Sequence, residues 1–124
     1  MPFSASLADR VRDAVAREPG VAEKRMFGGL AFLHRGNMLV GVHGDSLIAR
    51  LGAEAADIAL VESGVRPFDL TGTPMKGWVI VDADAIDSDV ALRDWIGLAL
   101  QFVRTLPPKA SKSAGAPRKS SRPG

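Results

Sequence analysis

Two histidines, His34 and His43, are the residues of this sequence best suited to acid–base or metal chemistry. An imidazole titrates near neutrality and binds transition metals, but most histidine-based metal sites need several ligands close together. Arg35-Gly36 and Gly44-Asp45 predict two-residue turns, which place the two histidines at opposite ends of one strand pair, about 20 Å apart. We therefore expect two separate, solvated histidines beside turns and no shared metal ion.

A run of acids from Asp82 to Asp89 has the composition of a calcium loop. The positions do not match one, because Ile86 is the fifth residue, Asp87 stands where glycine makes the sharp turn, and Arg93 replaces the bidentate glutamate. Acids also gather where a strand ends and a helix begins, since the positive end of the helix dipole favours them. We interpret the run as a helix start and expect no metal site.

The glycine-rich segments do not match a nucleotide-binding motif either. Residues 72–77 have the glycine spacing of a phosphate loop, but Trp78 stands where the lysine belongs and Pro74 removes a backbone donor. Gly28-Gly29 is too short for a dinucleotide fingerprint and indicates a close approach between strands. The sequence has no cysteine and no Gly-x-Ser-x-Gly elbow to supply a nucleophile. We expect no catalytic residue, no cofactor and no enzyme activity, with an uncharacterised small-metabolite enzyme as an alternative.

Helix and strand signals predict one α+β domain over residues 1–106. Leu7, Val11 and Val15 recur at four-residue steps, which is typical of one helix face. Ser6 and Asp87 are expected to cap the first and last helices. The expected elements are a helix at 4–17, three or four strands within 21–51, a helix at 53–63, strands at 65–70 and 77–82, and a helix at 87–106. The predicted fold is a central antiparallel sheet of about five to six strands flanked by helices, in the order α-β-β-β-(β)-α-β-β-α.

Strict alternation along the predicted strands sorts their side chains onto two faces. One face is wholly apolar and is expected to be the core face: Ala31, Leu33, Met38, Val40, Val42, Leu47, Ala49 and Leu51. The other is mixed: Leu30, Phe32, His34, Leu39, Gly41, His43, Ile48 and Arg50. Because aromatic and arginine anchors are favoured at interface centres, we predict a partner-binding surface on this second face. Its expected residues are Lys24, Arg25, Phe32, Leu39, Ile48 and Arg50. Cover by a helix of the same molecule is the alternative.

Positive charge is concentrated near the C-terminal end. Residues 107–124 contain five basic and no acidic side chains, whereas residues 1–106 contain 11 basic and 14 acidic ones. The 107–124 segment has no large apolar residue, so we expect a disordered basic tail. The tail is the alternative functional element, a weak nucleic-acid binder without aromatic residues for stacking. Its basic residues are Lys109, Lys112, Arg118, Lys119 and Arg122.

Composition bounds the remaining possibilities. Hydrophobic types make up 46% of the 124 residues and charged types 24%, which is ordinary for a globular domain. Nothing in the sequence requires an oxidising compartment, and charges interrupt the first twenty residues, so no signal peptide or membrane span is indicated. We expect a cytoplasmic protein without membrane association, and the sequence leaves its oligomeric state open.

Several segments, taken in order, resemble the N-terminal domain of the TfoX/Sxy family between about residues 4 and 106. They are Lys24-Arg25-Met26-Phe27-Gly28-Gly29-Leu30-Ala31-Phe32, Gly36-Asn37-Met38, Asp45 to Arg50, Pro67-Phe68 and Met75-Lys76-Gly77-Trp78. The resemblance implies an α+β fold with a central antiparallel sheet, and no catalytic residue.

The resemblance also implies a regulatory role. Full-length members regulate natural competence by assisting a cyclic-AMP receptor protein at promoters, and they carry a second, C-terminal domain. This chain has the 107–124 segment in its place. We therefore expect a stand-alone N-terminal domain that acts as a non-catalytic protein-interaction or accessory transcription-regulator module, with a protein partner such as a transcription regulator.

Overall fold

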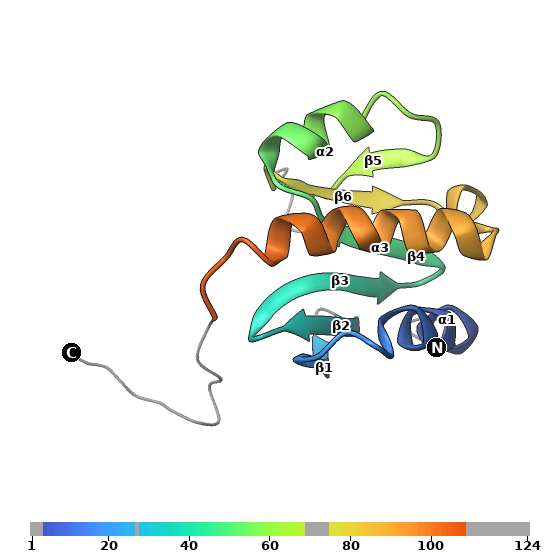
Figure 1. The fold of residues 1–124 in the computed structure, drawn as a ribbon. Coiled ribbons are helices and arrows are strands. Elements are labelled where there is room, and N and C mark those ends of the chain that lie inside the picture. The colour runs from blue at the N-terminus through green and yellow to red at the C-terminus, as the bar shows by residue number, and fades with distance from the viewer. Residues whose placement is uncertain (1–3, 27, 69–74, 109–124) are drawn as a thin grey trace.

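A computed structural model describes residues 4–26, 28–68 and 75–108, which form an antiparallel sheet with helices packed against it (Figure 1). The elements are α1 (Ala5–Val15), β1 (Val21–Met26), β2 (Gly29–His34), β3 (Asn37–His43), β4 (Ser46–Arg50), α2 (Ala53–Ala59), β5 (Val65–Pro67), β6 (Trp78–Val81), the 3-10 helix η1 (Ala83–Ile86) and α3 (Asp89–Val103). The order α-β-β-β-β-α-β-β-α confirms the predicted α+β fold. None of the helices in these ranges is long and apolar enough to cross a membrane.

The sheet has six strands in the spatial order β1-β2-β3-β4-β6-β5. Strands β1 to β4 form a meander, and β6 pairs with β4 so that β5 becomes the edge strand. The register confirms both predicted two-residue turns, since His34 pairs with Asn37 and His43 pairs with Ser46. Arg35 and Gly36 in the first turn both have positive φ, as a two-residue hairpin turn of type I′ requires.

Serine side chains cap the first and last helices, although not the residues that we expected. The Ser4 hydroxyl, rather than that of Ser6, accepts a hydrogen bond from the Leu7 amide at the start of α1. At the start of α3, the Ser88 hydroxyl accepts from the Ala91 amide, so Ser88 rather than Asp87 is the cap. Each expected cap lies one or two residues from the observed one. Serine and aspartate can both cap a helix, and Ser4 and Ser6, like Asp87 and Ser88, are close enough in the sequence for either to be chosen.

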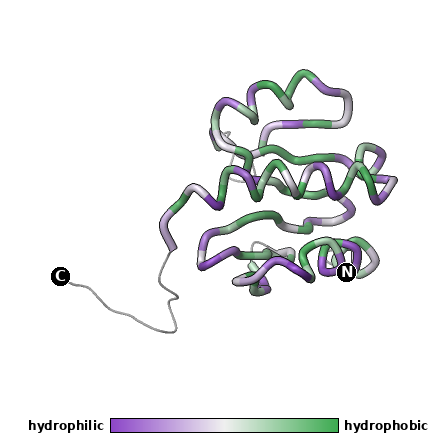
Figure 2. The backbone as a smooth tube through the Cα atoms, in the orientation of Figure 1, coloured by the Kyte–Doolittle hydropathy of each residue, from purple (hydrophilic) through white to green (hydrophobic). Residues whose placement is uncertain are grey.

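All three α-helices contribute to one core on the same face of the sheet. One buried cluster joins the helices to the sheet. Its helix residues are Leu7, Val11 and Val15 of α1, Ala56 and Ala59 of α2, and Leu92, Ile96, Ala99 and Val103 of α3. Its sheet residues are Leu30, Phe32, Val40, Val42, Leu47, Ala49, Val65, Val79 and Val81. Figure 2 shows hydrophobic residues concentrated along the central strands and hydrophilic ones in the turns. The molecule is therefore a two-layer structure, with the helices on one side of the sheet.

A β-bulge makes the predicted assignment of faces wrong for β2. Phe32 pairs with Val40 and Leu33 pairs with Met38, so Leu39 has no partner on β2. The extra residue shifts the alternation between the two strands, because two residues of one strand then oppose one residue of the other. Leu30, Phe32 and Leu39 therefore belong to the main core and not to the second face. Ala31, Leu33 and Met38, predicted on the core face, are excluded from that cluster.

The opposite face of the sheet carries a second, smaller apolar cluster. Ile48, Phe68 and Ile80 are buried there, with Met38 and Trp78 packed against them. Ile48 and Ile80 are cross-strand partners on β4 and β6. None of the helices in the described part of the chain lies on this face, so a covering helix, the alternative considered for it, is not found among these residues.

Two glycines provide a test of the packing. A Cβ at Gly29 would lie 2.2 Å from the Val42 carbonyl oxygen, whereas a Cβ at Gly97 in α3 would meet nothing within 4 Å. We expect Gly29→Ala to lower the free energy of unfolding by about 2 kcal/mol or more, since a backbone atom must move. Gly97→Ala is expected to raise it by about 0.5–1 kcal/mol, because alanine favours a helix. Urea denaturation of both variants measures the difference, and equal effects would contradict the strand packing described here.

Candidate functional site

His34 is buried and paired, and is not solvated as expected. The residue is only 3% exposed, and its Nε2 lies 3.3 Å from Oε2 of Glu18. His43 is half-buried at the other end of β3. Within the described residues, no three or more His, Asp or Glu side chains are grouped closely enough to hold a metal ion. The two histidines therefore belong to separate environments, and His34 is a member of an internal polar network.

This network joins three segments at one end of the sheet. Glu18, which follows α1, accepts a hydrogen bond from Arg104 at the end of α3 through Oε1 and contacts His34 through Oε2. Beside it, Asn37 Nδ2 donates to the Pro107 carbonyl oxygen over 2.9 Å. The Arg104 hydrogen bond, helped by the charge of Arg104 and by the neighbouring His34 ring, holds the pKa of Glu18 below its usual range although burial opposes the shift. Glu18 is thus an ionised anchor between the helices and the β2–β3 turn.

A nearby hollow is polar and contains two carboxylates that pair with arginines. The open hollow, of about 450 Å³, is lined by residues that include Arg12, Glu18, Glu23 and Phe32. Arg12 pairs with Glu23, and this hydrogen bond, with the charge of Arg12, lowers the pKa of Glu23 against the effect of burial. Both carboxylates in the hollow are therefore held in the ionised form by arginines, which makes them poor proton donors near neutral pH.

The structure does not bring the six predicted partner-binding residues together. Phe32, Leu39 and Ile48 are at most 1% exposed, so none of them offers a contact surface. Lys24 and Arg25 are exposed on the edge strand β1, where successive residues point to opposite faces. The predicted surface is therefore wrong as a set: three members are core residues, and Arg50 lies on β4, separated from β1 by two strands. The basic residues of the proposed nucleic-acid tail, 109–124, lie outside the described residues.

Arg50 is the exception, because it occupies a defined aromatic environment. It pairs across the sheet with Trp78, and its guanidinium carbon lies 5.2 Å from the Trp78 ring centroid and 5.7 Å from that of Phe102 in α3. Phe68 extends the aromatic group, with its ring centroid 5.7 Å from that of Trp78. The side chain is half-buried, and burial lowers the pKa of Arg50. In the described part of the chain, no carboxylate forms an ion pair with it.

Charge is separated between the two ends of the sheet. One end contains the β2–β3 turn, the last residue of β4, the start of β6 and the end of α3, and we call it the basic end (Figure 1). Among the described residues, its charged side chains are Arg17, Arg35, Arg50, Lys76 and Arg104, with Glu18 and Glu54 as the acids. The opposite, acidic end contains the β3–β4 turn, the start of β5, η1 and the start of α3. Its acids are Asp45, Glu62, Asp82, Asp84, Asp87 and Asp89. Cations also lie at this end, because Arg10 pairs with Asp89, Arg66 pairs with Asp82, and Arg93 lies near the start of α3, so acids exceed cations there without excluding them.

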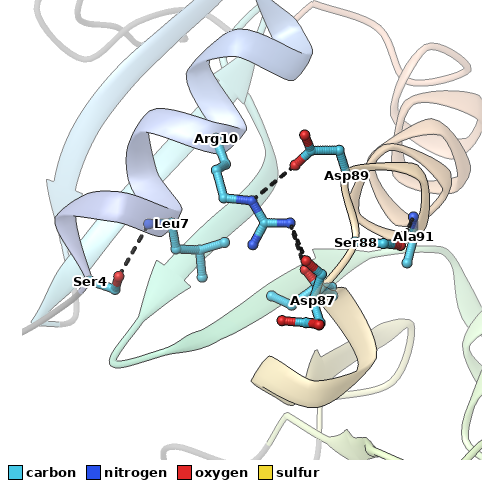
Figure 3. Close-up of polar contacts among 8 residues, drawn as sticks. Ser4, Leu7, Arg10, Asp87, Ser88, Asp89 and Ala91 are labelled. Carbon is cyan, nitrogen blue, oxygen red and sulfur yellow. Dashed lines mark hydrogen bonds and ion pairs between the residues drawn. The ribbon is translucent and has the colours of Figure 1, made fainter.

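Several acids of the run from Asp82 to Asp89 are used within the fold. Arg10 of α1 donates to Asp89 over 3.2 Å and to the Ile86 carbonyl oxygen over 2.7 Å, which fastens α1 to the start of α3 (Figure 3). Asp82 accepts from Arg66 over 2.7 Å. The run forms η1 and the start of α3, as predicted for a helix start rather than for a calcium loop.

The Glu18 network predicts a specific pH dependence. Because the pKa of Glu18 is lowered in the folded state, its contribution to stability is present above the ordinary value of 4.5 and is lost as the pH falls through the folded-state pKa. We expect Glu18→Gln to lower the free energy of unfolding by about 1 kcal/mol near neutral pH, through loss of charge-assisted hydrogen bonds. The difference from wild type should shrink in acid.

Urea denaturation between about pH 7 and pH 3 measures this effect. Glu54→Gln is the matched control, since Glu54 is an exposed acid at the same end of the sheet. A difference between wild type and Glu18→Gln that stays constant over this range would contradict the assigned network.

Comparison with known families identifies the fold. The chain matches the family model described as the TfoX N-terminal domain over residues 13–103. No curated protein and no solved structure matches it. The family match spans most of the 124 residues and includes strands β1 to β6 and all of α3. The chain therefore belongs to the TfoX N-terminal domain family.

Proposed function

We propose that this TfoX N-terminal-type domain is a non-catalytic interaction module, of the accessory regulatory kind, that binds an acidic segment of a protein partner at its basic end. The observation that carries the proposal is the charge separation between the ends of the sheet. Within the described part of the chain, five cations and two acids surround the basic end, and one of the acids, Glu18, is already paired with Arg104 and His34. A cationic patch of this kind attracts and orients an anionic partner.

The charge of the rest of the body favours a short acidic segment over a long polyanion. Residues 1–106 contain 11 basic and 14 acidic side chains, and the acidic end repels negative charge. Nucleic-acid binding gains its affinity from many phosphate contacts along an extended basic surface. An acidic peptide segment needs only the local patch, so we place a protein partner before nucleic acid. Binding of nucleic acid through the five basic residues of 109–124 is the second candidate.

The polar groups of the interior support recognition rather than catalysis as the role. A general acid or base works best with a pKa near the working pH. Glu18 and Glu23, which line the open hollow, have lowered pKa values and bind arginines. His34 is 3% exposed and contacts one of these carboxylates, so its ring does not face a substrate-sized space.

The proposal predicts a difference between two substitutions that change the net charge equally. Lys76→Glu alters the basic end, and Arg93→Glu alters the exposed surface of α3 near the acidic end. We expect Lys76→Glu to weaken binding of a fluorescein-labelled Glu/Asp-rich peptide roughly threefold or more, with a reduced salt dependence, because a local cation is lost. Arg93→Glu should have little effect. Fluorescence anisotropy at several salt concentrations measures both.

Capture from a native lysate with the same variants then asks whether the patch is used by a protein. Proteins retained by wild type and Arg93→Glu but lost with Lys76→Glu would support the proposal. Equal loss from both variants would contradict it. Retention that depends on residues 109–124 and disappears after nuclease treatment would favour nucleic-acid binding instead.

A further inference from the structure

Arg50 differs from Arg10, the other half-buried arginine of the described residues, in having no anionic partner among them. Arg10 pairs with Asp89. The more exposed Arg12, Arg66 and Arg104 also have carboxylate partners. Arg50 is half-buried, and among the described residues its neighbours are the rings of Trp78 and Phe102. From this contrast and its place at the basic end, we infer that Arg50 is the group that binds a carboxylate side chain of the partner's acidic segment. The inference rests on the proposed function and adds the residue that recognises the partner.

The aromatic rings leave the hydrogen-bonding groups of Arg50 available. A guanidinium is planar, and its five N–H donors point outward in the plane, in a fork that matches the two oxygens of a carboxylate. In a cation–π contact the guanidinium lies over the face of an aromatic ring, and the ring carries no lone pair in that direction to accept a conventional hydrogen bond. Trp78 and Phe102, whose ring centroids lie 5.2 and 5.7 Å from the guanidinium carbon, thus restrict the position of the fork without offering its donors an oxygen or nitrogen acceptor. A group held in this way loses less conformational entropy when a ligand binds.

The local backbone is built around this aromatic environment. The Leu51 and Gly52 amides both donate to the Gly77 carbonyl oxygen, over 2.8 and 3.1 Å, and so hold the end of β4 against the start of β6. Gly52 has a φ of +88°, and a Cβ there would lie 2.6 Å from Cδ1 of Phe102. Glycine at position 52 therefore lets the Phe102 ring approach the chain beside Arg50.

The electrostatics favour an anion at this place. Burial lowers the pKa of Arg50, which reports a cost of removing its charge from water. No carboxylate in the described part of the chain offsets that cost, so a bound anion would regain part of it. A carboxylate matches the oriented fork in a bidentate geometry, as a phosphate also can, and the titration with inorganic phosphate distinguishes the two anions.

The test uses Trp78 as its reporter. Trp95→Phe removes the other tryptophan, a core residue that is 7% exposed, so that the remaining emission comes from Trp78. In this background we would titrate an unlabelled Glu/Asp-rich peptide, a Gln/Asn-rich peptide of equal length, sodium acetate and inorganic phosphate. The inference predicts saturable quenching or enhancement by the acidic peptide alone at micromolar to low millimolar concentrations.

Arg50→Met and Arg50→Lys separate recognition from a structural role. Arg50→Met keeps the aliphatic stem, and we expect affinity for the acidic peptide to fall about tenfold. Arg50→Lys keeps the charge but not the planar fork, and most of the affinity should still be lost. Stability distinguishes recognition from a structural role. Because an unpaired, half-buried charge is removed, we expect the urea midpoint of Arg50→Met to equal or exceed that of the parent, whereas loss of a structural residue would lower it.

The outcomes of these measurements either support or overturn the role of Arg50. Unchanged peptide affinity in Arg50→Met, with Lys76→Glu still weakening binding, would overturn the role of Arg50 and leave the proposed function standing. A fall in the urea midpoint of Arg50→Met equal to that of a core variant would show that Arg50 is structural and would also overturn it. Tighter response to phosphate, or an equal response to acetate, would contradict recognition of an acidic peptide. Loss of capture with Lys76→Glu but not with Arg50→Met would separate failure of this inference from failure of the proposed function.

Discussion

Burial of one face of the sheet beneath α3 is the interaction on which the rest of the structure depends. Val40, Ala49, Val79 and Val81 of three neighbouring strands are 0% exposed, and they share a core with α3. Because side chains alternate along a strand, this burial assigns every other residue to the opposite face. The register that results places the turns between strands at the two ends of the sheet. The charged residues of the basic and acidic ends lie in or beside these turns and at the helix ends.

Local signals in the sequence were sufficient for the order of elements but not for all of the packing. Glycine-containing turns and apolar periodicity predicted the helices, the meander and the pairing of His34 with Asn37. The bulge at Leu39 has no comparable local signature, because Met38, Leu39 and Val40 are a continuous apolar run. One extra residue there reversed the faces predicted for β2. Without this bulge, strict alternation assigns Phe32 to the predicted binding surface, although Phe32 is a core residue.

The candidate site was less predictable than the fold, since its contacts join residues far apart in the chain. The sequence predicts Arg50 as a basic residue on a strand of the second face, and the structure confirms that it lies on a strand, at the end of β4. Its environment depends on Trp78, 28 residues later, and on Phe102, 52 residues later. Glu18, His34 and Arg104 meet for the same reason. A resemblance to the family supplied the fold, but only the cross-strand register and the end of α3 show which side chains are neighbours.

Helix electrostatics explain the charges that lie at helix ends, but not a charge that lies on a strand. Cations stabilise the C-terminal end of a helix and anions its N-terminal end. Arg104 is the C-cap residue of α3, Glu54 lies in the first turn of α2, and Asp89 lies in the first turn of α3. Those charges would be favoured in a protein with no partner at all. Arg50 is on a strand, pairs with no described acid and is half-buried, so neither helix stability nor an ion pair accounts for its charge. The basic end therefore combines charges that the fold itself uses, such as Arg104, with others, including the half-buried Arg50, for which the described residues supply no acidic partner.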